Sequence, residues 1–250
     1  MSFQIRSIFA VLALGITLLS GAAIAEDTAH GMDEDAIRTI VRDYLRENPE
    51  VIIEALQEYE RRENERQSAD QIAAIRQLTP VMENDPASPD NGVVDGDVTL
   101  VEFFDYQCSY CKKIFPSIED IMEDDPNLRV VFKEYPILGP ESVLAARVAL
   151  AARKQGKYMV FHTAMMELRG TLTEAIIMQT ALEVGIDPTR LSADMRDPAI
   201  QEHLDRNRQI ADAIGVRGTP ALVIGEQLIP GAIEKSALVK LIEQVRGNSS

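Results

Sequence analysis

The sequence has few aromatic residues and no tryptophan, and its cysteine is limited to two residues, Cys108 and Cys111. Two cysteines exclude a framework of several disulfides, and the three histidines, none of them paired at a ligand spacing, leave too few ligands for a zinc site. Positive charge is also scarce, because 25 Lys and Arg stand against 40 Asp and Glu, for a formal net charge of −15. This balance excludes nucleic acid and anionic lipid as partners held by bulk electrostatics.

The chain has 250 residues, 46% of them hydrophobic, which is enough for one or two domains with a substantial core. Its first 25 residues stand apart, with a positive charge at Arg6, an apolar run over positions 8–19, and small residues at positions 23 and 25. This pattern predicts an export signal cleaved after Ala25, and the alternative is a retained membrane anchor. No other stretch approaches a transmembrane helix, so we expect no membrane contact beyond the signal.

Residues 26–80 form a helical segment by pattern, because their apolar positions recur at three- and four-residue spacing. Pro49 interrupts the pattern and predicts two helices. Residues 60–71 are almost entirely charged or polar, as in a solvated helix or a stalk.

A stretch rich in Pro, Asp, Asn and Ser at residues 81–91 predicts a linker to a second domain, residues 92–250. That domain alternates β-prone and helical runs, and a helix starts at the cysteines between the first two strands. The predicted ranges are 98–104 and 128–135 for these strands, 141–214 for a long helical stretch, 221–224 and 227–229 for a hairpin, and about 234–245 for the last helix.

This order of elements predicts an α/β fold. Two strands that flank a helix favour a parallel pair, and the hairpin adds antiparallel strands to the same sheet. We therefore expect an α/β sandwich with a helical insertion at about residues 141–214, preceded by the N-terminal helical segment.

The two cysteines lie just after a predicted buried strand, at the predicted start of a helix. The unpaired N–H groups and the partial positive charge of a helix N-terminus stabilise a thiolate, which is the nucleophile of disulfide exchange. Cys108, in the first turn, is the better placed to be that thiolate. Cys111 lies one turn further on the same face, so it is assigned as the resolving cysteine that attacks a mixed disulfide.

Two structural interpretations of this pair are weaker. A disulfide that closes a loop of four residues removes little entropy from the unfolded chain. Half of a zinc site would lack its other ligands. We therefore expect redox chemistry at Cys108 and Cys111, with no metal and no cofactor.

Three further residues fit the same site. Glu102 lies six positions before Cys108 in an otherwise apolar strand, where burial would raise the pKa of its carboxyl and let it exchange a proton with Cys111. A solvated strand end is the alternative. Pro220 follows Thr219 where a strand starts, which suits either a cis bond or an ordinary trans proline. A cis bond there would expose the Thr219 backbone for pairing with an extended substrate.

Other charged residues are given no catalytic role. Lys112 and Lys113 add minor positive charge near Cys108, and Lys133 is expected at the surface. His162 and His203 fall in the helical stretch and are interpreted as surface or satisfied histidines.

Three stretches of the second domain occur in the order found in one known family: VEFFDYQCSYCK at 101–112, YPILGPES at 135–142, and GVRGTPA at 215–221. They resemble the DsbA-like proteins of the thioredoxin fold, and the resemblance covers roughly residues 92–246. It implies a thioredoxin fold with a helical insertion, and the export signal predicts a periplasmic location. For the site it implies Cys108 as nucleophile, Cys111 as resolving thiol, Glu102 as the buried acid, and Pro220 as the cis-proline after Thr219.

Residues 44–52, YLRENPEVI, resemble the N-terminal segment of the ScsC-like branch of that family. Members of this branch can oligomerise through the segment and act as disulfide isomerases or reductases. An amphipathic helix pair must bury its apolar stripe, either on a partner chain or on its own catalytic domain. We expect a homo-oligomer through residues 33–78. Ser109-Tyr110 departs from the Pro-His of DsbA itself, which removes a thiolate stabiliser, and its tyrosine is similar to isomerase-type sites.

The leading hypothesis is a periplasmic thiol–disulfide oxidoreductase that acts on exported cysteine-containing proteins and is reset by a redox partner protein. Oxidase, isomerase and reductase all stay open. The alternative is a copper(I)-binding or metal-stress protein, because soft Cu(I) suits two thiolates. A third hypothesis is a chaperone-like binder whose cysteines are incidental.

Overall fold

A computed structural model describes residues 33–91 and 93–248, and the predicted export signal at residues 1–25 lies outside them. The chain divides into two compact units, residues 1–58 and 59–250. We call them the N-terminal unit and the C-terminal unit.

The N-terminal unit contains helix α1 (Glu34–Glu47) and the beginning of α2 (Glu50–Asn84), which are separated at Pro49 as predicted. Asp33 caps α1 by accepting the Asp35 N–H at 3.4 Å. No residue of α1 is buried. Both helices expose large apolar side chains, which are Ile37, Ile40, Val41, Tyr44, Ile52, Ile53 and Leu56.

Helix α2 is continuous through the charged stretch at residues 60–71, and it runs past Pro80, where we expected the helical segment to end. Its C-terminal half belongs to the C-terminal unit, where Ile75 and Met82 are buried. Their burial on either side of Pro80 offsets the backbone hydrogen bond that a proline cannot make. Gln71 fixes the same half of the helix by donating from Nε2 to the carbonyl of Ile214 at 3.0 Å.

The C-terminal unit is built on a four-stranded sheet in the order β2-β1-β3-β4. Strands β1 (Val98–Phe104) and β2 (Leu128–Glu134) are parallel, and β3 (Ala221–Ile224) and β4 (Gln227–Pro230) form an antiparallel hairpin beside β1. Gly225, with φ of 55°, opens the two-residue turn of the hairpin. The predicted parallel pair and hairpin are thus confirmed.

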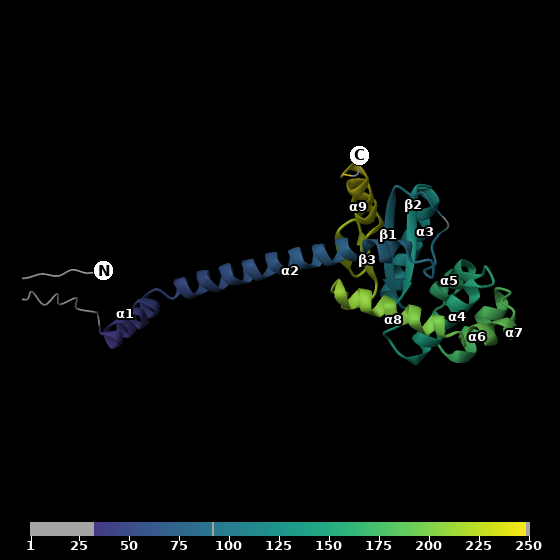
Figure 1. Cartoon of the computed structure of the whole chain (residues 1–250), viewed down its shortest axis with the longest axis horizontal. Coiled ribbons are helices and arrows are strands. Elements are labelled where there is room, and N and C mark those ends of the chain that lie inside the picture. Colours follow the sequence, from purple (N-terminus) through teal and green to yellow (C-terminus); the bar gives the residue numbers. More distant parts are fainter. Residues whose placement is uncertain (1–32, 92, 249–250) are drawn as a thin grey trace, which may run out of the picture. The chain divides into compact units, whose positions relative to one another are not determined.

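Helices cover both faces of this sheet (Figure 1). Leu100 and Phe104 of β1 share a buried cluster with α3 (Ser109–Asp124) and α9 (Lys235–Asn248). Because side chains alternate along a strand, Val101 and Phe103 point to the other face, where they share a cluster with Ile75 of α2. Glu102 therefore faces the same side as Leu100 and Phe104, toward the helix that carries the cysteines.

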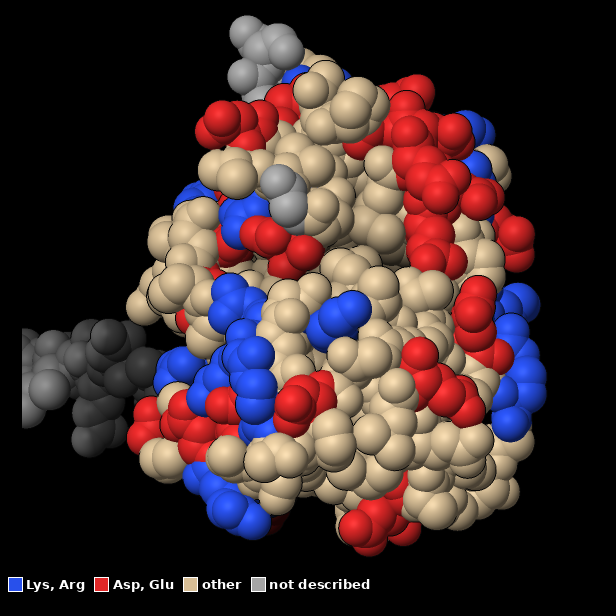
Figure 2. Space-filling view, turned by 90° about the vertical axis from the view of Figure 1, so that its right-hand side faces the viewer, with Lys and Arg blue, Asp and Glu red and all other residues tan. Residues whose placement is uncertain are grey.

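The predicted helical insertion forms five helices between β2 and β3. They are α4 (Pro140–Arg153), α5 (Tyr158–Glu167), α6 (Glu174–Glu183), α7 (Pro188–Asp194) and α8 (Pro198–Ala213). Helices α4 to α7 gather beside one end of the sheet (Figure 1). Figure 2 faces that side of the unit, where acidic side chains gather at the upper right and acidic and basic side chains lie next to each other at the lower left.

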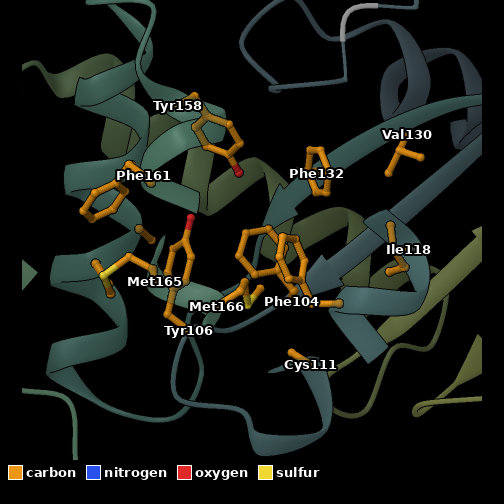
Figure 3. Close-up of a cluster of buried hydrophobic side chains, with 14 of the residues drawn as sticks. Phe104, Tyr106, Cys111, Ile118, Val130, Phe132, Tyr158, Phe161, Met165 and Met166 are labelled. Carbon is orange, nitrogen blue, oxygen red and sulfur yellow. The ribbon is translucent and has the colours of Figure 1, made fainter. Parts of the chain in front are cut away.

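An aromatic cluster joins the sheet to the insertion (Figure 3). The ring of Phe104 lies 5.1 Å from that of Tyr106 and 6.4 Å from that of Phe132, both edge to face. Tyr158 and Phe161 of α5 contribute the opposite wall. Such aromatic packing holds the insertion firmly against the strand that leads to Cys108.

The segment between α2 and β1 lies along the outer edge of β2. The N–H of Phe132 donates to the carbonyl of Pro89 at 2.9 Å, and the N–H of Asn91 donates to the carbonyl of Val130 at 3.1 Å. The Asn91 side chain adds two hydrogen bonds, from the Val130 N–H and to the Leu128 carbonyl. Residues 89–91 therefore serve as a short extra strand.

Lys133 is fully buried, so the expectation that it lies at the surface is wrong. Its Nζ donates to Oγ of Ser88 at 2.6 Å, within the segment that covers β2. Burial lowers the pKa of Lys133 to about 8, and Asp85 partly opposes that shift. The covering segment, which the strand pattern itself does not reveal, removes this side chain from solvent.

Candidate active site

Cys108 is the N-cap residue of α3, immediately after β1. Its Sγ accepts the backbone N–H of Cys111 at 3.3 Å and lies 3.2 Å from the carbonyl oxygen of Thr219, to which the thiol donates. Cys111 is fully buried one turn further along the helix. Both cysteines are free thiols in this structure.

The two thiols differ strongly in acidity. Contacts with Cys111, first of all the hydrogen bond between the two sulfurs, lower the pKa of Cys108 to about 6, with smaller help from Thr219 and the Tyr110 backbone. Burial is the main reason that the pKa of Cys111 lies well above its usual range. At neutral pH the site therefore holds a thiolate at Cys108 and a neutral thiol at Cys111.

Glu102 is fully buried, and among the described residues neither of its carboxylate oxygens has a hydrogen-bond partner. Burial, followed by the negative charge of Cys108, raises its pKa to about 8. Its own charge is one of the influences that raise the pKa of Cys111, so the two groups interact. Glu102 can thus hold or accept a proton close to neutral pH.

The Thr219–Pro220 peptide bond is cis. The carbonyl of Pro220 accepts the N–H of Gly231 at 2.8 Å, which ties this loop to the end of β4. Through the contact between Cys108 and Thr219, the structure brings the loop to the cysteine pair across more than a hundred residues of sequence.

Two clefts adjoin the site. One, of about 550 Å³, is lined by Gln107 and Ser109, the neighbours of Cys108. The other, of about 510 Å³, is lined by Thr219 and Pro220. One cleft is thus lined by the chain neighbours of Cys108, and the other by Thr219, whose carbonyl oxygen Cys108 contacts.

Asp105 is a structural residue of the site that sequence reasoning missed. Its Oδ1 accepts from the Gln107 N–H at 2.8 Å and from Oγ of Ser142 at 2.7 Å. Its Oδ2 accepts from the N–H groups of Ile137 and Leu138 at 2.8 and 2.9 Å. Asp105 thereby fastens the turn before Cys108 to the start of the insertion, and its place directly after an apolar strand was the available signal.

A buried polar cluster around Glu134 was also missed. The hydroxyls of Tyr106 and Tyr158 donate to Oε1 of Glu134 at 3.1 and 3.0 Å, and Nδ1 of His162 lies 3.0 Å from the Tyr106 hydroxyl. Burial raises the pKa of Glu134 well above its usual range, while the hydrogen bonds from the two tyrosines oppose that shift. Burial lowers the pKa of His162 to about 3, so its imidazole is neutral at pH 7. The cluster links β2, the turn before Cys108 and α5.

Both histidines of the insertion are buried and lie away from the cysteine pair in the hydrogen-bond network. Nε2 of His162 has no partner among the described residues. Nδ1 of His203 lies 3.2 Å from Oδ2 of Asp85 without hydrogen-bond geometry, and burial lowers its pKa to about 4. Among the described residues, the polar neighbours of the two histidines are Tyr106, Asn207 and Asp85, and neither histidine hydrogen-bonds to Cys108 or Cys111.

Within residues 33–91 and 93–248, no group of three or more His, Cys, Asp and Glu side chains is arranged to hold a metal ion. In the same part of the chain, no helix combines the length and apolar character needed to cross a bilayer.

Comparison with known proteins identifies two families along the chain. Residues 99–243 match the DSBA-like thioredoxin domain, and residues 33–66 match the copper resistance protein ScsC N-terminal domain. A thioredoxin-like oxidoreductase from Silicibacter pomeroyi is 42% identical, with 67% of this chain and 97% of that one covered and a TM-score of 0.66. A Proteus mirabilis ScsC variant with a linker deletion is 28% identical, with 92% and 100% covered and a TM-score of 0.68.

Among curated proteins, the Na(+)/H(+) antiporter NhaA of Herminiimonas arsenicoxydans is 27% identical over 172 residues, or 67% of this chain. The chain spans only 28% of that protein's length. The family match over the second domain and the 42% identity to a solved oxidoreductase agree with the cysteine pair, the cis-proline loop and the sheet order described above. The chain belongs to the DsbA-like thioredoxin family of thiol–disulfide oxidoreductases.

Proposed function

We propose that this chain is an exported thiol–disulfide oxidoreductase that rearranges disulfides in exported cysteine-containing proteins, with Cys108 as the nucleophile. The observation that carries the proposal is the acidic thiol of Cys108, with a pKa of about 6, beside the neutral, buried thiol of Cys111. The predicted export signal and the family's periplasmic members support a periplasmic location.

The reaction begins when the Cys108 thiolate attacks one sulfur of a substrate disulfide. The substrate S–S bond breaks, a mixed disulfide forms at Cys108, and the released substrate sulfur takes up a proton. The Cys111 thiol then gives its proton to Glu102 and attacks Cys108, which releases the second substrate sulfur as a thiolate and leaves a Cys108–Cys111 disulfide. The substrate is reduced and the enzyme is oxidised, and the reverse sequence oxidises a substrate dithiol.

Glu102 is a suitable proton acceptor because the pKa of its carboxyl falls when the mixed disulfide forms. The Cys108 thiolate helps to raise its pKa to about 8, and that charge disappears when the mixed disulfide forms. The carboxyl then becomes more acidic and is ionised more often, in the one intermediate where Cys111 must lose a proton. The Thr219 backbone pairs with the extended substrate beside Cys108.

Isomerisation is the form of exchange that the N-terminal unit favours. Its exposed apolar side chains on α1 and α2 suit burial against other copies of the chain, and the ScsC-type match covers the same residues. Linked copies hold a misfolded substrate at more than one Cys108, and they shield that thiol from an oxidising partner. A separate redox protein keeps Cys108 and Cys111 reduced.

The direct test is reactivation of scrambled ribonuclease by the mature, reduced protein. We expect reactivation several-fold above the rate with glutathione alone, because Cys108 can open wrong disulfides, and loss of that gain in Cys108→Ser. The measurement is recovery of ribonuclease activity over time. If the wild type fails here but oxidises reduced ribonuclease, the protein is an oxidase and the isomerase proposal is wrong.

Oligomerisation through the N-terminal unit can be tested by placing charged side chains on its exposed apolar surface. We expect Ile40→Glu with Leu56→Glu to convert an oligomer into a monomer, because both side chains are more than half exposed and a buried carboxylate would oppose association. Sedimentation equilibrium gives the mass. Ser68→Glu, an added charge within the solvated stretch of α2, is the control and should leave the mass unchanged. A wild-type monomer would contradict the proposal.

Copper(I) binding is a second candidate, because the matched N-terminal family is named for copper resistance and two thiolates suit a soft ion. The burial of Cys111 and the lack of a third ligand near it, among the described residues, weigh against a stable site. Stoichiometric copper that survives a chelator after anaerobic purification, and is lost in Cys108→Ser, would favour this candidate.

A further inference from the structure

The 550 Å³ cleft beside Cys108 has a basic lining. One wall is the first turn of α3, with Lys112 and Lys113, and the other is the segment after α5, with Leu168 and Arg169. Nζ of Lys112 crosses between the walls and donates to the carbonyl of Leu168 at 2.8 Å. A hydrogen bond therefore joins the two walls of the cleft, and two of its cations, Lys113 and Arg169, are exposed.

The cations of this cleft are not held in ion pairs by the described part of the chain. Among the described residues, no carboxylate forms an ion pair with Lys112, Lys113 or Arg169. The Arg169 guanidinium instead donates to backbone carbonyls at the end of α5, including that of Glu167 at 2.9 Å. Burial and then the charge of Arg169 lower the pKa of Lys112, and the negative charge of Asp105 partly opposes that shift. This cluster of three positive charges contrasts with the chain as a whole, whose formal net charge is −15.

The basic cleft lies beside the cysteine that carries out the exchange reaction. Gln107 and Ser109 line it, and both adjoin Cys108 in the chain. An extended chain advances about 3.3 Å per residue, so a substrate held at Cys108 and Thr219 reaches the cleft within a few residues of its own cysteine. A carboxylate at those substrate positions would meet Lys113 and Arg169 directly.

We propose that the basic cleft selects protein substrates that carry acidic side chains within a few residues of the exchanging cysteine. This inference rests on the proposed function, because it names the substrate class of the same site. Lys113 and Arg169 provide the selection by charge, and Lys112 positions the two walls. The second cleft, whose walls are the 215–221 loop, Gln71 and β4, carries one cation, Arg217, where the first carries three.

The test uses symmetrical peptide disulfides, so that attack on either sulfur gives the same products. Each is a dimer of a short peptide with one central cysteine, flanked by Glu, Gln or Lys. One disulfide and the reduced enzyme give two peptide thiols and the Cys108–Cys111 disulfide, so electrons balance. Rates are measured by quenching and mass spectrometry, and each is divided by the rate of the same disulfide with dithiothreitol, which removes intrinsic differences in peptide reactivity.

We expect the Glu disulfide to react about fivefold faster than the Gln disulfide at low salt, and the Lys disulfide to react more slowly. The preference should fall below twofold in 0.5 M NaCl, since screening shortens the reach of exposed charges. It should fall equally in Lys113→Gln with Arg169→Gln. The matched control, Lys240→Gln with Arg190→Gln, removes two exposed cations outside the cleft and should keep the full preference.

The outcomes distinguish a failure of this inference from a failure of the proposed function. Equal normalised rates for the Glu and Gln disulfides overturn the inference and leave the proposed function standing. Failure of every disulfide to react overturns both. If oxidised glutathione gains from the cleft cations but the Glu peptide does not, the cleft binds a small anionic disulfide instead, and the assignment to protein substrates is wrong.

Discussion

Iodoacetamide should alkylate Cys108 at least about a hundredfold faster than Cys111 at pH 7, with a pH midpoint near 6. The reason is the difference in acidity, because a thiol whose pKa is about 6 is mostly thiolate at pH 7. A thiol at the reference value of 9.0 is only about 1% thiolate there, and burial places Cys111 above that value. The rate should fall as the pH drops through 6, because protonation then removes the nucleophile. Mass spectrometry of the labelled cysteine across pH gives both quantities.

Two variants make this result specific. Cys111→Ala removes the hydrogen bond that contributes most to the acidity of Cys108, so the midpoint should rise. Cys108→Ser leaves only Cys111, which should stay unlabelled in the folded protein because it is fully buried. A wild-type midpoint near 9, or equal labelling of both cysteines, would contradict the assignment of Cys108 as the nucleophile.

Glu102→Gln should slow resolution of the mixed disulfide by about a hundredfold, which is the usual scale for loss of a general base. The isosteric amide keeps the buried volume but cannot accept the proton of Cys111. In the wild type the resolution rate should rise with pH as the carboxyl ionises, and in the variant this dependence should disappear. Rapid quenching and mass spectrometry would follow the mixed disulfide as it accumulates.

The variant also separates the two halves of the reaction. Attack by Cys108 should keep its midpoint near 6, because Glu102, with a pKa of about 8, is still protonated and uncharged in the pH range where Cys108 titrates. Glu134→Gln is the matched control, since it also replaces a buried carboxyl by its amide, and the Glu134 carboxyl hydrogen-bonds to the hydroxyls of Tyr106 and Tyr158. Resolution as fast in Glu102→Gln as in wild type would remove Glu102 from the mechanism.

The sequence predicted those features that depend on a single helix or strand. The apolar run at residues 98–104 predicted a buried strand, and the spacing of Cys108 and Cys111 predicted a pair on one helix face. The alternation along β1 predicted that Glu102 points inward, as it does. Each of these follows from local periodicity.

Features that depend on contacts between two segments of the chain could not be predicted from the sequence. Lys133 and Glu134 end a strand in the way that exposed charges usually do, but the segment at 85–91 covers one and helix α5 covers the other. Helix α2 continues past Pro80 because its buried neighbours pack on the sheet, which no helix-stop rule contains. Arg169 joins Lys112 only through the folding of the insertion onto α3.

The short extra strand of residues 89–91 along β2 affects whether other extended chains can pair with the edge of the sheet. An uncovered outer strand is a template for any extended chain, and unfolded proteins with wrong disulfides offer many. Here Pro89 and Asn91 occupy the hydrogen-bonding groups at that side of the sheet. The other border, β4, has four residues and ends at Pro230, which cannot donate to a neighbouring chain. Both borders thus discourage pairing with the edge of another extended chain, and so discourage co-aggregation.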